Sequence, residues 1–223
     1  MAGIQLVSAG GLVIAGGQEA SSPLQVTLMP SGGNAYRFSS FTGTIAAALA
    51  ANSEVLQFRF VSGTQTYAIV EKVVLDGMGL VAVATAAGPV GFQMVVARVW
   101  TVAGSGGTRI AMTADNLQME TAEPNSQVND LGIATTGALT AGTKTLDANA
   151  VGQVIGGVGT AAITTYGAGT LMPTQPFMDA SDGNSPLVLA NQEGFIIKTT
   201  HVGPAAFTYA VGFTVVWREV TSF

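Results

Sequence analysis

The chain holds one histidine, His201, and this residue is the first candidate for acid–base chemistry. Imidazole is the side chain that most often exchanges a proton near neutral pH. His201 follows Thr200 and lies just before Gly203-Pro204, a sequence typical of a strand end or a turn. A histidine in such a place is usually solvated or hydrogen-bonded to a neighbour. We therefore expect no general base here.

The segment 179–184, with the sequence DASDGN, is the densest group of oxygen ligands in the chain. Asp179, Ser181, Asp182 and Asn184 are of the types that bind Ca²⁺, but their spacing differs from that of an EF-hand loop. The same residue types form turns through Asx hydrogen bonds, and we favour that interpretation over a calcium site. A single histidine without any cysteine cannot supply a zinc ligand set. The sequence predicts no metal and no cofactor.

Glu120 and Glu123 form a carboxylate pair of the type that glycoside hydrolysis uses. They lie just before Pro124, where the chain is expected to turn, and closeness in sequence does not set the separation that the reaction needs. We interpret them as part of a solvated loop. Gly104–Gly107 lacks the Lys-Ser/Thr pair of a phosphate loop, and the chain contains no Gly-x-Ser-x-Gly motif. We expect no enzyme activity, no catalytic residue and no small-molecule substrate.

Charge is scarce: Asp, Glu, Lys and Arg make up 9% of the 223 residues, and the formal net charge is −5. The cations are far apart in sequence, whereas nucleic-acid binding needs clustered Lys and Arg, so we expect no direct nucleic-acid partner. No Lys or Arg precedes Arg37, so the basic start of a secretory signal is missing. The apolar stretches are shorter than the ~20 residues that cross a bilayer, and we expect no membrane partner.

Apolar residues account for 48% of the chain, and the mean hydropathy is +0.45. Because the charged residues are too few to cover the surface of a protein of this size, we expect apolar and neutral surface to lie against other subunits. Neutral polar residues such as Thr, Ser, Gln and Asn are the alternative way to cover it. Composition favours a protein that works by assembly.

The C-terminal stretch alternates large apolar and small residues with a period of two. In a pleated strand the two sets face opposite sides, which predicts a long strand that ends near Val220 and buries its aromatic face. The residues of that face are Phe207, Tyr209, Val211, Phe213, Val215 and Trp217.

Two further stretches show the same alternation. In Val55–Val61, Gln57 and Arg59 are expected to point outward, away from the apolar set. In Phe92–Thr101 the apolar face is interrupted by Arg98, which needs a partner or a strand end. The residues expected on the inner faces are Leu56, Phe58 and Phe60 in the first stretch and Phe92, Met94, Val96 and Trp100 in the second.

Two apolar, β-branched runs, 66–75 and 194–200, fit strands that are buried on both sides. Only Ile45–Ala51 has a helical composition, and it is too short to hold a helix unaided, so one or two turns or an extended segment fit equally well. Residues 137–176, rich in Gly, Ala and Thr, fit either a long loop or a set of small-residue strands. Turn signals occur at Asp76-Gly77, Gly88-Pro89, Gly104–Gly107, Asp182-Gly183-Asn184 and Gly203-Pro204.

Short strands, frequent turns and little helical periodicity predict an all-β protein. We expect an antiparallel β-sandwich that is jelly-roll-like. A single sandwich domain is expected over residues 36–223, preceded by an extended N-terminal arm or edge segment over residues 1–35.

Four blocks of the chain carry a likeness to a known group: TGTIAAALAANSEVLQFRF (42–60), GTKTLDANAVGQ (142–153), PLVLANQEGFII (186–197) and VGFTVVWREV (211–220). They resemble uncharacterised structural proteins from the virions of tailed bacteriophages and prophages. In that group the segment NQEGF leads into a hydrophobic strand, and a terminal aromatic strand ends in Trp-Arg-Glu. The resemblance covers about a quarter of the chain, and residues 1–35 lie outside it.

The resemblance implies a place in a phage particle that assembles in the bacterial cytoplasm, and it brings no catalytic residues with it. Within the virion we favour the surface of the head and the role of a decoration or cement protein. Its expected partners are the major capsid protein and further copies of itself, as a homotrimer. We expect the N-terminal arm to strap onto a neighbour through Leu6, Leu12, Val13 and Ile14.

Three alternatives stay open at the level of sequence. The first is a tail or head-fibre component that binds a host surface glycan, which would need exposed aromatic side chains, whereas Trp100 and Trp217 fit a core. The second is a carbohydrate-active enzyme on a sandwich scaffold. The third is a bacterial adhesin.

Overall fold

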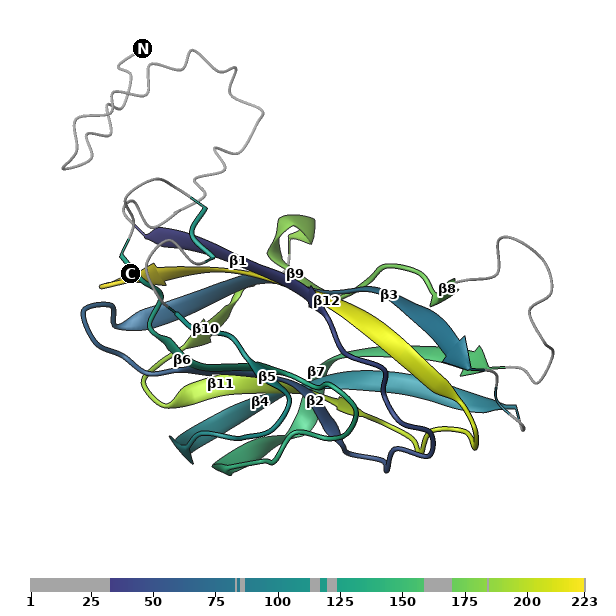
Figure 1. Cartoon of the computed structure of the whole chain (residues 1–223). Helices are drawn as coiled ribbons and strands as arrows, with labels where there is room; N and C mark the ends of the chain where they lie inside the picture. Colours follow the sequence, from purple (N-terminus) through teal and green to yellow (C-terminus); the bar gives the residue numbers. More distant parts are fainter. Residues whose placement is uncertain are drawn as a thin grey trace, which may run out of the picture.

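The computed structural model describes residues 33–82, 84, 87–112, 117–119, 124–158, 170–183 and 185–222. They form two antiparallel β-sheets that face each other, with one short 3-10 turn, η1 (Ala180–Asp182) (Figure 1). The expected all-β antiparallel sandwich is confirmed. The strands are β1 (Asn34–Phe41), β2 (Glu54–Phe60), β3 (Tyr67–Ala82), β4 (Gly88–Val102), β5 (Thr108–Arg109), β6 (Val128–Ile133), β7 (Thr143–Val158), β8 (Thr170–Met172), β9 (Gln175–Asp179), β10 (Leu187–Leu189), β11 (Glu193–Thr199) and β12 (Thr208–Val220).

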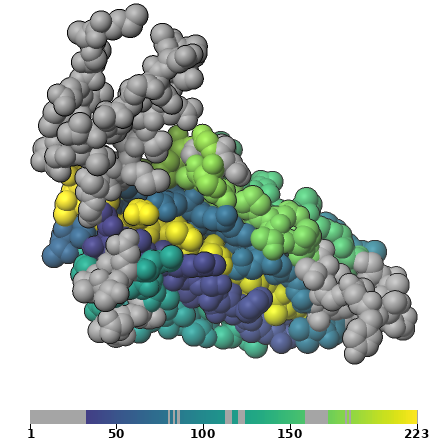
Figure 2. Space-filling view, turned by 90° about the horizontal axis from the view of Figure 1, so that it is seen from above, coloured from purple at the N-terminus to yellow at the C-terminus, as the bar shows by residue number. Residues whose placement is uncertain are grey.

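The strand order places sequence-distant segments side by side. The first sheet has the order β1-β12-β3-β10, and β8 and β9 also pair with β3. The second sheet has the order β5-β6-β2-β11-β4-β7. Apart from β5 and β6, the pairing is nested: β1 pairs with β12, β2 with β11, β3 with β8, β9 and β10, and β4 with β7. Figure 2 looks onto the first sheet, where β1, β12 and β3 run together.

The predicted C-terminal strand is confirmed as β12, and its aromatic face lies in the main core between the sheets. Trp217 is fully buried, stacks on Tyr36 at a centroid distance of 5.5 Å and meets Phe58 edge-on at 5.1 Å. Phe92 packs edge-on against Phe213 at 6.2 Å. These contacts join β12 and β1 of the first sheet to β2 and β4 of the second.

The outward side chains of β2 are a correction to the sequence prediction. Leu56, Phe58 and Phe60 do face the main core. Gln57 and Arg59 lie on the other face of the strand but are 0% and 7% exposed. They are buried because other segments cover this part of the second sheet.

The predicted apolar face of β4 is wrong at Trp100. Phe92 and Met94 lie in the main core, but Trp100 lies with Val95 and Ala97 in a separate cluster with Ile196, which we call the outer cluster. The reason is Val99, whose φ of 49° breaks the alternation of the strand. Arg98 has the partners that the sequence required, because it forms ion pairs with Glu193 (2.7 Å) and Asp147 (3.4 Å).

One further expectation is wrong, and the structure decides between alternatives for two others. The Asp76-Gly77 signal does not mark a turn, since β3 continues through it with Gly77 at a φ of 145° beside a register shift of β12. The segment 45–51 is not helical: Ile45 forms a bridge to Tyr209, and a turn follows. Of the two interpretations of 137–176, strands hold for β7, β8 and β9.

Strand β7 approaches the first sheet so closely that it needs glycine. A Cβ atom on Gly152 would lie 2.1 Å from the carbonyl oxygen of Phe177 in β9, and this backbone cannot move aside without disturbing its sheet. Gly157, five residues along the same strand, has no neighbour within 4 Å of the equivalent position. Substitutions at these two glycines therefore distinguish the effect of close packing from the general effect of replacing a glycine in a strand.

We expect Gly152→Ala to lower the free energy of unfolding by about 1–3 kcal/mol, because overpacking against backbone forces strain. Gly157→Ala is the matched control and should change stability by less than about 1 kcal/mol. Urea denaturation of both variants measures the difference. Equal effects at the two positions would contradict this account of the strand contact.

Candidate interaction surface

The outer face of the second sheet, which points away from the first sheet, carries a buried group of charged and amide side chains. They come from β2, β5, β6 and β7, and ion pairs and hydrogen bonds connect them with each other and with nearby backbone. We call this set the polar network: Glu54, Gln57, Arg59, Arg109, Asp130 and Lys144.

Gln57 lies at the centre of the polar network. Its amide nitrogen donates to Glu54 Oε2 (2.5 Å) and to the Thr140 carbonyl (2.8 Å). Its amide oxygen accepts a hydrogen bond from Arg109 Nη1 at 2.8 Å. Gly104 lies directly over this amide, because a Cβ there would be 2.2 Å from Gln57 Oε1. The buried amide is thus satisfied on both of its ends.

Lys144 closes the network from β7. Its ammonium group forms an ion pair with Glu54 (2.8 Å), also donates to the Ala141 carbonyl, and lies 4.3 Å from the ring centroid of Trp100. Both side chains of the ion pair are buried, at 3% and 8% exposed. Burial lowers the pKa of Lys144, and the hydrogen bond to Glu54 opposes that shift. A buried charge of this kind depends on its partner.

Arg109 and Arg59 hold the adjoining backbone. Arg109 Nη1 pairs with Asp130 at 2.5 Å, and the other oxygen of Asp130 accepts the Gly104 amide at 2.8 Å. Arg59 Nε donates to the Trp100 carbonyl at 2.7 Å, and burial lowers the pKa of its guanidinium. These bonds fasten the segment after β4 onto the sheet.

The polar network does not converge on a cleft. Each of its carboxylates meets a cation of the same network, although the Nε and Nη2 atoms of Arg109 are buried without a hydrogen-bond partner. In the described structure the network therefore clamps β7 and the 101–107 segment over the outer cluster. The sequence missed it because Gln57 and Arg59 fit the solvent side of a strand. The available signal was Arg59, a charged residue within an apolar strand of a chain that contains few charges.

Lys144→Met should lower the free energy of unfolding by about 3 kcal/mol, since it leaves Glu54 buried without its cation. Adding Glu54→Gln should recover part of that loss. Lys72→Met is the matched control: Lys72 pairs with Asp179 but is 44% exposed, and its loss should cost less than about 1 kcal/mol. Chemical denaturation measures all three variants. If Lys144→Met and Lys72→Met lowered the free energy of unfolding by similar amounts, the proposed role of the polar network in holding β7 would be wrong.

A second buried carboxylate, Glu219, lies at the end of β12. It is 0% exposed and accepts hydrogen bonds from Ser126 Oγ (2.6 Å), the Gln127 amide (2.9 Å) and Trp217 Nε1 (3.0 Å). Burial raises the pKa of Glu219, and these hydrogen bonds counteract the rise. Glu219 thereby ties the approach to β6 to the end of the first sheet.

The raised pKa of Glu219 predicts a pH dependence of stability. The folded chain holds this proton more tightly than the unfolded chain, so the contribution is present below the unfolded pKa of about 4.3 and is lost as pH rises through the folded pKa. The unfolding free energy of the wild type relative to Glu219→Gln should therefore fall as pH rises from about 4 to 7. Urea titrations at several pH values measure it. A difference that grows with pH would contradict the assignment.

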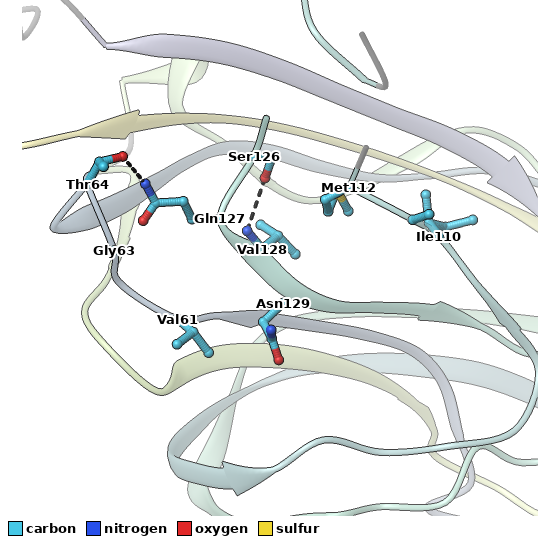
Figure 3. A pocket seen from close by; sticks show the side chains of 10 residues that line it. Val61, Gly63, Thr64, Ile110, Met112, Ser126, Gln127, Val128 and Asn129 are labelled. Atoms are coloured by element: carbon cyan, nitrogen blue, oxygen red, sulfur yellow. Dashed lines mark hydrogen bonds between the residues drawn. The ribbon is translucent and has the colours of Figure 1, made fainter. Parts of the chain in front are cut away.

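An open pocket of about 510 Å³ lies beside Glu219's partners, between the segment after β2, the segment after β5 and the start of β6 (Figure 3). Gln127 points across it to Thr64 and donates a hydrogen bond to its hydroxyl at 2.5 Å. The lining residues carry no ionisable side chain: they are Val61, Gly63, Thr64, Ile110, Ala111, Met112, Ser126, Gln127, Val128 and Asn129. They supply hydrogen bonds and apolar contact but no acid or base.

No family model, curated protein or solved structure matches this chain. The function must therefore be argued from its own residues. Among the described residues no cluster of His, Cys, Asp or Glu fits a metal ion, and no described helix is long and apolar enough to cross a bilayer.

The residues singled out from sequence do not come together. His201 is exposed after β11, with its Nδ1 2.7 Å from Thr200 Oγ1. Asp179 accepts from the backbone and hydroxyl of Ser181, which is the expected Asx turn, and it pairs with Lys72. The Lys72 contact lowers the pKa of Asp179 to about 2. Glu120, Glu123, Asn184 and the arm residues Leu6, Leu12, Val13 and Ile14 lie outside the described residues.

Apolar side chains remain at the surface of the sandwich. The outer face of the first sheet carries polar contacts: Arg218 pairs with Glu71 at 2.8 Å, and Thr214 donates to Asp76 at 2.6 Å. It also carries Phe41, which is 69% exposed next to Gly212. Strand β7 ends the second sheet and exposes Val151 and Ile155. The exposed large apolar residues are Phe41, Val81, Val99, Val102, Met119, Val151, Ile155 and Val202. They lie on β1, β3, β4 and β7 and on connecting segments, so exposed apolar side chains occur on both sheets.

Proposed function

We propose that the chain is a structural protein of a tailed-phage virion, and specifically a decoration or cement protein on the head. The observation that carries the proposal is the nested strand order together with the four blocks that resemble phage virion proteins. The exposed apolar side chains on both sheets support a role in contacts with other subunits.

The strand order supports a jelly roll. Nested pairing of β1 with β12, β2 with β11, β3 with β8 to β10 and β4 with β7 is what results when a long antiparallel ribbon is folded over into two sheets. We interpret β5 and β6 as an insertion that widens the second sheet. Jelly rolls occur in viral capsid proteins and also in lectins and cupins, so the topology supports the proposal only together with the resemblance.

The resembling blocks fall on strands that the sandwich depends on. The block 42–60 contains β2, 142–153 contains most of β7, 186–197 leads through β10 into β11, and 211–220 lies in β12. The block around NQEGF turns from β10 in the first sheet into β11 in the second. The likeness therefore covers both sheets of the sandwich.

The proposed mechanism is mechanical. Each copy would bury apolar area on major capsid subunits, at roughly 25 cal/mol per Å², and many weak contacts would add up over the shell. The described chain begins at Gly33, where a Cβ would lie 2.7 Å from a Val220 side-chain carbon, so residues 1–32 precede the sandwich at the β1–β12 edge. We assign the strap to this part, with Leu6, Leu12, Val13 and Ile14 on the neighbour, as part of a homotrimer on the head.

Virions purified from a phage that encodes this chain should contain it on the order of hundreds of copies per particle, as quantified by mass spectrometry. A few to a few tens of copies would indicate a tail or fibre component instead. Absence from the particle would overturn the proposal.

Deletion of residues 1–30 should leave the sandwich folded but weaken attachment to the head, because the strap is lost while the described strands remain. Far-UV circular dichroism checks the fold, and rebinding to heads stripped of the protein measures attachment. An unfolded deletion variant, or one that binds as well as the full chain, would refute the strap.

A further inference from the structure

Strand β7 ends the second sheet with an edge that pairs with no other described strand. It is 16 residues long, closes the second sheet, and among the described residues pairs only with β4. Its other edge therefore offers a row of backbone amide and carbonyl groups. Native proteins usually protect such an edge with charged residues, proline or a covering segment, because it is a template for another strand.

The outer face of β7 changes its pattern at a bulge. Met94 faces Gly152 and Val95 faces Ala150, so Val151 is an extra residue in β7. Before the bulge Ala150 packs against the outer cluster, and after it Val154 enters the main core. The outward positions beyond the bulge are thus Val151, Gln153 and Ile155, and the two apolar ones are 49% and 63% exposed.

Apart from the bulge at Val151, the stretch 148–158 lacks the usual protection against pairing. It contains no charged residue and no proline, and the only charges of β7 are Lys144 and Asp147 near the other end of the strand. Lys144 is buried in the polar network, and Asp147 pairs with Arg98. A strand laid against 148–158 would therefore meet no charge from β7.

The two exposed apolar residues of this stretch are placed symmetrically about Gln153, with Val151 two residues before it and Ile155 two residues after it. We propose that β7 pairs with β7 of a second copy of this chain, antiparallel, with a two-fold axis at Gln153. An isologous contact of this kind needs one patch that complements itself, and antiparallel pairing about Gln153 provides it. The proposal rests on this edge alone and not on the phage function.

In this register Val151 of one copy lies opposite Ile155 of the other, on both sides of the axis. Directly opposed apolar side chains on one face stabilise a sheet, and each would cover the other's exposed surface. The two Gln153 side chains meet at the axis, where their amides can hydrogen-bond to each other. The two second sheets then become one continuous sheet through both copies.

A charge exchange tests the register. Ile155→Lys places an ammonium against Val151 of the partner and should halve the mass measured by light scattering, from dimer to monomer or, where the proposed homotrimer forms, from hexamer to trimer. The fold should persist by circular dichroism. Val151→Glu/Ile155→Lys places opposite charges face to face across the axis and should restore the mass. Within one strand these residues are about 13 Å apart, so the rescue must occur between copies.

Two controls define failure. Val202→Lys alters another exposed apolar residue, 60% exposed, and should leave the mass unchanged. Val151→Lys/Ile155→Lys should not restore it. A wild-type mass that Ile155→Lys leaves unchanged, or a restored mass in both double variants, would overturn the proposal.

Cysteine cross-linking provides a second measurement that does not depend on disrupting the contact. The chain has no cysteine, so Gln153→Cys introduces a single thiol at the axis. Directly opposed residues have Cβ atoms about 4.5–5.5 Å apart, close enough for a disulfide after a small adjustment. Mild oxidation should give a covalent dimer. Asn149→Cys is the control, since the two copies of that residue would be about 26 Å apart, and equal cross-linking of both variants would overturn the register.

Discussion

The structure depends first on the burial of the aromatic side of β12 between the two sheets. This strand lies between β1 and β3, so both neighbours are held in register by its backbone, while its side chains pack onto β2 and β4 of the facing sheet. Trp217 and Phe213 each contact aromatic rings from more than one strand. Because aromatic side chains bury large areas and prefer stacked or edge-on geometry, this stripe sets how the sheets align. Burial also raises the pKa of Tyr209 to about 12.

A second constraint acts on the opposite side of the second sheet. On that side apolar packing is limited to the outer cluster around Trp100, and the ion pairs and hydrogen bonds of the polar network hold the neighbouring segments in place. Buried ion pairs contribute little net stability compared with apolar packing, but they penalise any arrangement that separates the partners. The polar network therefore specifies where β7 and the 101–107 segment lie more than it strengthens the fold.

The main elements of the fold follow from local sequence because period-two alternation is a direct consequence of the pleat. β12 and β2 are visible in this way, whereas β11 is visible as an apolar, β-branched run. Contacts between distant segments cannot be predicted in this way. The residues that cover Gln57 and Arg59 are more than forty positions away in the sequence, and no local pattern indicates them. Single backbone conformations are equally hidden, as Val99 shows by moving Trp100 to the other face. Asp76-Gly77 has the composition of a turn, yet pairing on both sides of β3 keeps it extended.

The clamp over the second sheet also limits the geometry of any larger assembly. A sandwich usually has two flat outer faces on which another sheet can pack. Here the outer face of the second sheet is partly covered by the 101–107 segment and β7 of the same chain. A molecule laid against that side would meet β7 and the 101–107 segment and not the strands that they cover.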